Sequence, residues 1–375
     1  MPRGRPVPRV LPLLLCVLGA LLTGCGAPGT PRDTAERDVR EAVAAWSRTP
    51  PERLAGIPLE GWSYEVTSVR RDGARATARA ELHYRLAGYD TAPAGSAREL
   101  TLDGQGGRWR VTADRPAPGA LPQLWDQGAV TVARGAHSLV LGGEGQSPGA
   151  LSAIAAEADR AVPAAGAAWP RPWSGRVVVL VPGSLERMAG LLGRPAEAYR
   201  GLGAVTTGQV GAGPAPADRV VVNPQAYPEL SGQGRRIVLT HEVTHVATRA
   251  ATSATTPLWL SEGFADWAAY RGTSTTPAQG APVLARAVRR GEVPGGLPRT
   301  EAFAFGGDPE AAARAYEGAW LACRLIAEKW GEAGLVRLYE AAGREPWPNA
   351  LAHALGTDTD TLTRAWQESL RDELG

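Results

Sequence analysis

The first third of the chain is patterned for one helix and a series of strands. Between residues 33 and 46, apolar residues recur at the spacing of one helix face, and Asp33-Thr34 is a helix start signal. Apolar and polar residues then alternate in four runs separated by Gly and Asp-Gly turn signals: residues 62–69, 74–86, 97–102 and 108–112. This order predicts a helix followed by a four-stranded antiparallel sheet.

The rest of the chain begins with strand-like runs and ends in helical ones. After the Pro-rich segment 116–122, the pattern predicts two strands, a helix and a strand, at residues 129–133, 137–142, 149–168 and 175–182. Helical spacing follows over residues 281–290, 309–330, 332–342 and 359–374. We therefore expect an α+β protein of two domains, residues 33–120 and 121–375. The second domain would have a mixed sheet and a mostly helical C-terminal half.

The N-terminus has the composition of a secretory signal. Three arginines in the first nine residues precede an apolar run, residues 10–22, that is too short to span a membrane. Leu22-Thr23-Gly24-Cys25 resembles the bacterial lipobox, which implies cleavage before Cys25 and lipidation of its thiol. We expect a signal peptide at 1–24, a tether at 25–32 and a lipid anchor on the extracytoplasmic face of the cell membrane. The alternative is a plain signal peptide with an incidental cysteine.

The composition bears on which partners and which disulfides we expect. The chain has 40 basic and 38 acidic residues and a formal net charge of +2, so nothing in its charge points to a nucleic acid. Of its 3 cysteines, Cys16 lies in the expected signal peptide and Cys25 at the expected anchor. Cys323 is then alone in an apolar helix, and we expect no disulfide within the mature chain.

The most informative short motif is His241-Glu242-Val243-Thr244-His245, in a run that is typical of a buried helix. Residues at i and i+4 lie on one helix face, so the imidazoles of His241 and His245 converge on one point, as a Zn²⁺ ion requires. Glu242, one step round the helix, can reach a water bound to that metal. The alternative is a pair of histidines whose hydrogen bonds are satisfied in a core.

A catalytic zinc site needs a third protein ligand. One known continuation places a Gly and then a His after the second histidine, but Thr248 and Ala251 stand there. The other uses a glutamate on a following helix, and Glu262 follows His245 by 17 residues, after a loop that ends at Pro257. Asp266 lies four residues after Glu262, on the same face, where it can accept a hydrogen bond from a ligating imidazole. The alternative is a solvated acidic face.

These two segments resemble a known family. The HEVTH sequence followed by LWLSEGFADW is similar to the gluzincin clan of zinc metallopeptidases, over the region from about Val220 to Tyr339. The resemblance implies a zincin-like fold in which His241, His245 and Glu262 hold one zinc ion and Glu242 acts as general base. The N-terminal helix and sheet are similar to the nuclear-transport-factor-2-like cone. We interpret them as a spacer or interaction module, and the alternative is a module with a binding pocket.

Peptide hydrolysis also needs a donor for the oxyanion. Tyr316 and His353 are the candidates. The segment Tyr316-Glu317-Gly318 is similar to the Tyr-Glu-x-Gly segment that supplies this tyrosine in aminopeptidase-like gluzincins, although here the glycine comes one position earlier. Tyr316 can also be an ordinary residue of an amphipathic helix.

Two features bear on the substrate, which we expect to be a peptide or protein. The run 218–224 predicts a strand beside the metal helix, and we interpret it as the edge strand that pairs with extended substrate. Residues 201–216, rich in small residues, are interpreted as a mobile loop. No Gly-x-Met-Glu-Asn segment for binding an N-terminal amine is present, which favours an endopeptidase. A metal-holding scaffold lipoprotein with vestigial catalysis, or a structural protein without metal, remains the alternative.

Overall fold

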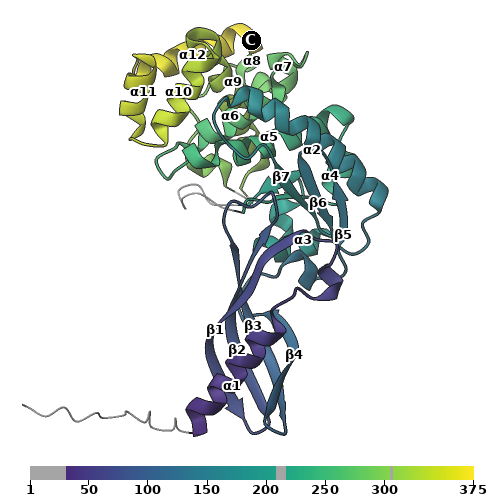
Figure 1. Cartoon of the computed structure of the whole chain (residues 1–375). Helices are drawn as coiled ribbons and strands as arrows, with labels where there is room; N and C mark the ends of the chain where they lie inside the picture. Colours follow the sequence, from purple (N-terminus) through teal and green to yellow (C-terminus); the bar gives the residue numbers. More distant parts are fainter. Residues whose placement is uncertain (1–30, 208–216, 305–306) are drawn as a thin grey trace, which may run out of the picture.

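The computed structural model of the chain describes residues 31–207, 217–304 and 307–375. The fold is mixed α+β, with two separate sheets and many helices (Figure 1). The expected signal peptide and Cys25 lie outside the described residues. Helix α1 begins at Pro31, within the expected tether.

A helix and a meander form the N-terminal module, which we define as α1 and β1–β4. Its elements are α1 (Pro31–Trp46), β1 (Leu59–Asp72), β2 (Arg75–Leu86), β3 (Ala94–Gln105) and β4 (Arg108–Pro116). The four strands pair in sequence order, each antiparallel to the next. Alternate residues of β2 and β3, including Leu82 and Leu100, are fully buried, as the period of a half-buried strand requires. Val39 and Val43 of α1 pack in the same core.

The second sheet has strand order β5-β6-β7-β9-β8. Its strands are β5 (Thr131–Arg134), β6 (Ser138–Gly142), β7 (Val177–Val181), β8 (Ala204–Thr206) and β9 (Val220–Val222). Strands β6, β7 and β9 are parallel, and the outer strands β5 and β8 are antiparallel to their neighbours.

This strand order corrects two expectations. The segment 218–224 does contain a strand, but β9 lies inside the sheet, between β7 and β8. The edge strand is β8, within the segment 201–216 that was expected to be a loop throughout. Sequence order gives no strand order, and a three-residue strand is too short to show an alternating pattern.

The two faces of this sheet are covered differently. Val179, Val220 and Val222 pack on one side in the core that includes α2 (Pro148–Ala168) and α5 (Gly232–Thr248). On the other side, Leu139, Leu141 and Val178 belong to the core of the N-terminal module. Val221 packs there against α3 (Leu185–Leu192). The N-terminal module, the segment with Leu124 and Trp125, and α3 therefore share in covering this face.

Helices make up the C-terminal half, above the sheet in Figure 1. After the short α4 (Ala226–Glu229) and after α5 come α6 (Leu258–Tyr270), α7 (Pro277–Gly280), α8 (Pro282–Arg289), α9 (Pro309–Trp330), α10 (Glu332–Ala342), α11 (Trp347–Leu355) and α12 (Thr359–Leu374). Helices α6 and α9 approach closely at Gly263, where an added Cβ would lie 2.3 Å from the carbonyl oxygen of Ala319. Only glycine permits that approach, which sets the position of α6.

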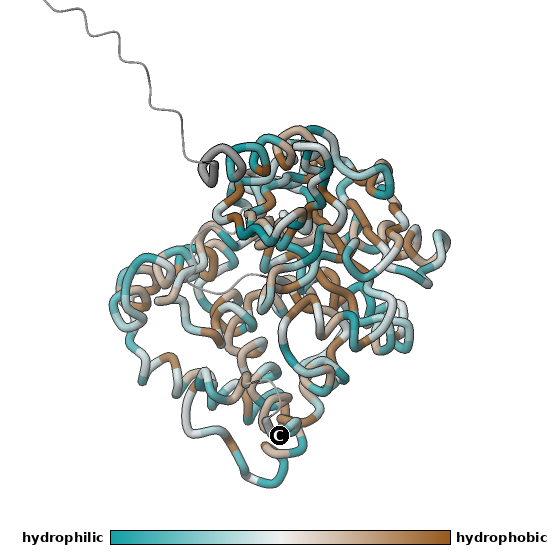
Figure 2. The backbone as a smooth tube through the Cα atoms, turned by 90° about the horizontal axis from the view of Figure 1, so that it is seen from below, coloured by the Kyte–Doolittle hydropathy of each residue, from teal (hydrophilic) through white to brown (hydrophobic). Residues whose placement is uncertain are grey.

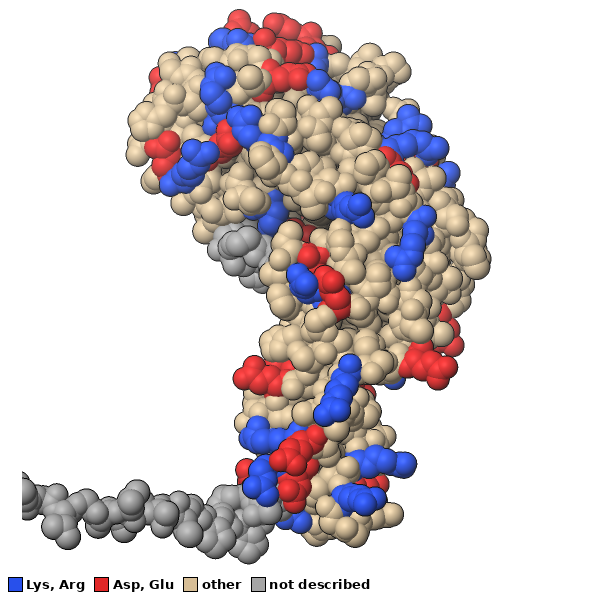
Figure 3. Space-filling view, in the orientation of Figure 1, with Lys and Arg blue, Asp and Glu red and all other residues tan. Residues whose placement is uncertain are grey.

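Apolar stretches of the chain gather toward the interior, and hydrophilic stretches occupy outer turns (Figure 2). Basic and acidic side chains are interspersed on the face shown in Figure 3. Among the described residues, no helix has the length and apolar character needed to cross a membrane.

Candidate metal centre and active site

Helix α5 has two opposite faces. Leu239, Val243 and Ala247 recur every four residues and are at most 2% exposed. His241 and His245 fall on the opposite face because each lies two positions, about 200°, from that apolar stripe. Packing of the apolar stripe therefore turns both imidazoles toward an open cavity, which α5 shares with strand β8 and helix α6.

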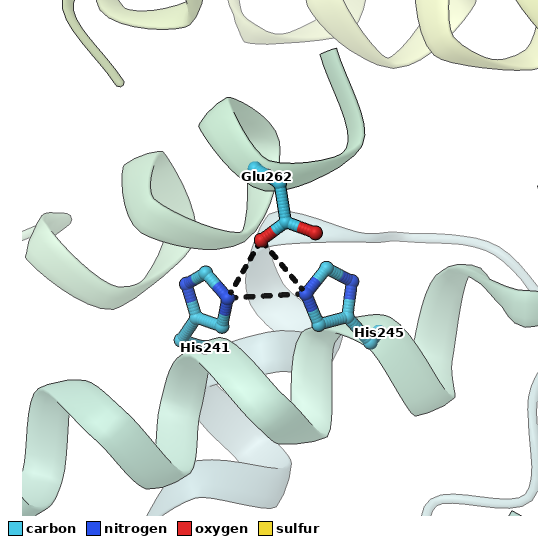
Figure 4. Close-up of side chains that lie close together, drawn as sticks. All are labelled: His241, His245 and Glu262. Atoms are coloured by element: carbon cyan, nitrogen blue, oxygen red, sulfur yellow. Dashed lines mark hydrogen bonds and ion pairs between the residues drawn. The ribbon is translucent and has the colours of Figure 1, made fainter. Parts of the chain in front are cut away.

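Helix α6 brings the third residue. Pro257 precedes its first residue, and the chain reverses over residues 252–257 so that α6 packs back across α5. Figure 4 shows Glu262 of α6 pointing at the two imidazoles of α5. Glu262 Oε2 lies 3.3 Å from His241 Nε2 and 3.5 Å from His245 Nε2, and the two Nε2 atoms are 3.1 Å apart.

These three distances fit a single metal ion. Ligand atoms about 2.1 Å from a tetrahedral ion lie about 3.4 Å from one another. The observed separations of 3.1, 3.3 and 3.5 Å bracket that value. Two imidazole nitrogens and one carboxylate oxygen are also a donor set of catalytic zinc, with three protein ligands and one position left for water.

Asp266 holds one of the imidazoles. Its Oδ1 lies 2.8 Å from His241 Nδ1, so this carboxylate holds a proton on Nδ1 and turns Nε2 toward the cluster. Burial lowers the pKa of His241, but the carboxylates of Asp266 and Glu262 raise it more, and the net pKa lies well above its ordinary value. Burial raises the pKa of Glu262, but His245 and His241 lower it more, so this carboxyl stays ionised. The carboxylates that favour a proton on the His241 ring also favour a metal cation, which would take the place of the Nε2 proton on binding.

Glu242 lies beside the cluster and is held by a residue that the sequence did not indicate. Its side chain is nearly buried, and Thr206 Oγ1 lies 2.7 Å from its Oε2 and 3.0 Å from its main-chain oxygen. Thr206 ends the edge strand β8. No local pattern marks this threonine, because the contact joins residues 36 apart and depends on the position of β8.

The two candidates for the oxyanion donor lie in different places. Tyr316 of α9 lines the same cavity as the cluster. Burial and the nearby carboxylates of Glu262, Asp266 and Glu242 raise its pKa, so its hydroxyl remains a donor at neutral pH. His353 is exposed on α11, where it pairs with Glu345, and it is not brought to the site.

The cavity that joins these residues has a volume of about 370 Å³. One end is apolar, with Leu202, Ile237 and Val238. At the other end Arg249 donates to the Asp218 carboxylate and to the main-chain oxygen of Thr207, so its charge is already paired.

A network of buried hydroxyl groups connects the two helices that carry the metal-site residues. Tyr339 of α10 lies within 2.8 Å of Thr252 and 3.3 Å of Thr248 and of Ser261. These residues belong to the end of α5, the loop after it and α6. Since Ser261 precedes Glu262, this network fixes the two ligand-bearing helices relative to each other.

Comparisons with known proteins give a partial likeness to solved structures. No model of a protein family matches the chain, and no curated protein matches it. Among solved structures, it is similar to a crystal structure of a mutant M1 zinc metallopeptidase from Deinococcus radiodurans, bound to a Tyr-Ser-Ala substrate. The identity is 16% and the TM-score 0.36, over 78% of this chain and 61% of that chain. The chain therefore spans less than two thirds of the length of that peptidase.

Proposed function

We propose that this protein is a zinc-dependent metallopeptidase. The observation that carries the proposal is the convergence of His241, His245 and Glu262 on one point, with Glu242 beside them in the same cavity. Two histidines and a glutamate hold the ion, and a second glutamate that is not a ligand is free for proton transfer. This division of roles is the one that metal-assisted hydrolysis needs.

The chain's residues have separate tasks in this reaction. A bound zinc ion supplies a water of lowered pKa and polarises a carbonyl group. Glu242 takes the proton from that water and delivers it to the leaving amine. Tyr316, which lines the same cavity, donates a hydrogen bond to the oxygen on which negative charge develops. Asp266 keeps the His241 ring in the orientation and tautomer that ligation requires.

The edge strand β8 is suited to receive an extended peptide. Gly203 accepts from the N–H of Asn223 and Thr207 donates to the oxygen of Arg219, so the main-chain groups of Gly203, Val205 and Thr207 face β9. By alternation, those of Ala204 and Thr206 point outward from the sheet. An added strand there would bind substrate through its main chain and without strict sequence preference.

The charges of the cavity favour cleavage within a chain over removal of a terminal residue. Of the described residues that line it, the carboxylates of Glu262 and Asp266 face imidazoles, and Arg249 is paired with Asp218. Glu242 is assigned to proton transfer. No further charged side chain in this set is placed to bind a substrate's terminal ammonium or carboxylate. We therefore propose an endopeptidase.

The setting of this activity is also a proposal. We assign residues 121–375 to a zincin-like peptidase domain of gluzincin type and residues 33–120 to a domain similar to the nuclear-transport-factor-2 cone. The lipobox sequence supports a lipoprotein anchored through Cys25 at the extracytoplasmic face of the membrane, with a signal peptide at 1–24 and a peptide or protein substrate. The near-balanced charge of the chain supports a function without nucleic acid.

The deciding experiment compares the zinc-loaded wild type with Glu242→Gln on a library of internally quenched peptides. Glu242→Gln should keep stoichiometric zinc by elemental analysis and lose turnover by about 10²–10⁴-fold, the usual contribution of a general base. The matched control is Glu328→Gln, which changes an exposed glutamate on α9. Its zinc content and turnover should equal those of the wild type. Zinc bound in both proteins with equal inactivity would instead favour the vestigial scaffold, and the absence of stoichiometric zinc would reject the metal site.

A further inference from the structure

Thr206 connects the edge strand to the residue proposed as general base. Strand β8 places residues 204 and 206 on the face that packs toward α5, since Ala204 belongs to the core beneath that helix. The Thr206 hydroxyl therefore meets Glu242, at 2.7 Å from Oε2. Within the described residues, no other side chain hydrogen-bonds to the Glu242 carboxylate.

We propose that Thr206 is a positioning residue that holds the Glu242 carboxylate in its working orientation. This inference rests on the proposed function, in which Glu242 is the base. A glutamate has three rotatable side-chain bonds, so its carboxylate adopts several orientations unless another group holds it. The Thr206 hydroxyl donates to Oε2 and fixes that oxygen. Oε1 is then the oxygen that takes up the proton of the attacking water.

The strand end that carries Thr206 is itself held firmly. The N–H of Thr207 donates to the oxygen of Arg219 at 2.8 Å, and the N–H of Arg219 donates back to Thr207 Oγ1 at 2.9 Å. The Arg249 guanidinium donates to the main-chain oxygen of Thr207 at 2.9 Å. The hydroxyl is therefore presented by a braced backbone, which a positioning group requires if it is to hold another side chain within a few tenths of an ångström.

The placement also links substrate binding to the base. The main chain of Thr206 belongs to the strand that is proposed to pair with substrate, and its side chain contacts Glu242. A peptide added to β8 would immobilise this strand further. The carboxylate is thus ordered most completely when substrate is present, so loss of the hydroxyl should reduce kcat more than it changes KM.

The alternative role of Thr206 is structural. Its hydroxyl has one proton and also lies 3.0 Å from the main-chain oxygen of Glu242. If the proton is donated to that oxygen, the hydroxyl ties β8 to α5 and does not orient the carboxylate. A structural tie would affect stability and substrate binding together, whereas a positioning role would affect turnover selectively.

Kinetics of Thr206→Val and Thr206→Ser separate these roles. Valine keeps the shape and removes the hydroxyl, whereas serine keeps the hydroxyl. We expect Thr206→Val to lower kcat about 10–100-fold, with KM within about threefold and zinc content unchanged, and Thr206→Ser to return kcat to within about threefold of the wild type. The control Thr67→Val, on β1 of the N-terminal module, should behave as the wild type. A kcat for Thr206→Val within twofold of the wild type, or a serine variant as slow as the valine variant, overturns the inference.

A second measurement does not depend on turnover. In metal-free protein, a double-mutant cycle of Thr206→Val and Glu242→Ala, followed by urea unfolding, measures the coupling between the two side chains. We expect a coupling of about fivefold or more in the unfolding equilibrium, as for a hydrogen bond to a carboxylate. Additive effects would overturn the contact itself. An inactive wild type with a coupled cycle would reject the proposed function and the catalytic role of Thr206, while the contact would stand.

Discussion

At the scale of single residues, the candidate site divides into residues that the sequence identifies and one that it does not. His241, Glu242 and His245 are set by helix periodicity, which is local, and Glu262 and Asp266 follow from the same periodicity on the next helix. Thr206 has no such signal, because its role depends on how an edge strand lies beside α5. Tyr316 was one of two open candidates, and its place in the cavity depends on the packing of α9, which spacing alone does not give.

The carboxylate that holds His241 gives a prediction at this scale. Asp266→Ala removes the acceptor of the His241 Nδ1 proton, so the ring can rotate and its Nε2 lone pair is no longer fixed. We expect zinc affinity to fall about 10–100-fold, as for other partners of ligating histidines. Competition with a fluorescent zinc chelator measures the affinity directly. The control Asp103→Ala, on β3 of the N-terminal module, should bind zinc as the wild type does, and an unchanged affinity for Asp266→Ala would show that this carboxylate does not orient the ligand.

At the scale of elements, the long periodic segments were predictable and the short ones were not. The helices at α2, α9, α10 and α12 and the strands of the N-terminal module appear near the expected positions, because each has enough residues to show its period. Strand β8 has three residues, and the strand order of the second sheet comes from tertiary packing. For this reason the expectation that residues 218–224 form an edge strand was wrong. Helix α11 was missed in a Pro-rich segment, where Pro348 stands in its first turn.

The edge position of β8 can be tested through the substrate. A cleaved peptide is resynthesised with single N-methyl groups at the backbone amides within three residues of the scissile bond. Each methyl removes one donor and adds bulk, so the amides that pair with the outward groups of Ala204 or Thr206 should lose about tenfold or more in kcat/KM. Because strand pairing uses alternate residues, we expect sensitive and tolerant positions to alternate. The same peptide methylated at its far terminus is the control. Equal tolerance at every position would argue against strand addition.

At the scale of the whole molecule, the N-terminal module packs against the rest of the protein and is more than a separate appendage. Leu139, Leu141 and Val178, on one face of the second sheet, pack in the same core as residues of this module. An ion pair of Asp90 with Arg219 joins the two parts, at 2.7 Å and 2.8 Å, next to the strand that leads into the active site. Both side chains are nearly buried. The sequence carries no sign of this ion pair, since Asp90 and Arg219 lie 129 positions apart.

This arrangement predicts that the second part of the chain depends on the first. Residues 121–375 alone would expose the sheet face that Leu139, Leu141 and Val178 occupy and would leave Arg219 without Asp90. Exposure of this apolar face lowers stability and favours association between molecules. We expect the truncated protein to aggregate or to unfold at much lower urea concentration than the mature chain, as measured by light scattering and circular dichroism.

Two variants of the mature chain separate the ion pair from the apolar face. Asp90→Ala leaves Arg219 buried and unpaired, so the urea midpoint should fall markedly. The double variant Asp90→Ala, Arg219→Leu removes both charges and should recover much of that loss, because apolar groups replace a buried pair at little cost. Turnover should fall and recover together with stability, since the main-chain N–H of Arg219 donates to Thr207 at the end of β8. A truncated protein that is monomeric, as stable as the mature chain and fully active would show that the N-terminal module is only a spacer.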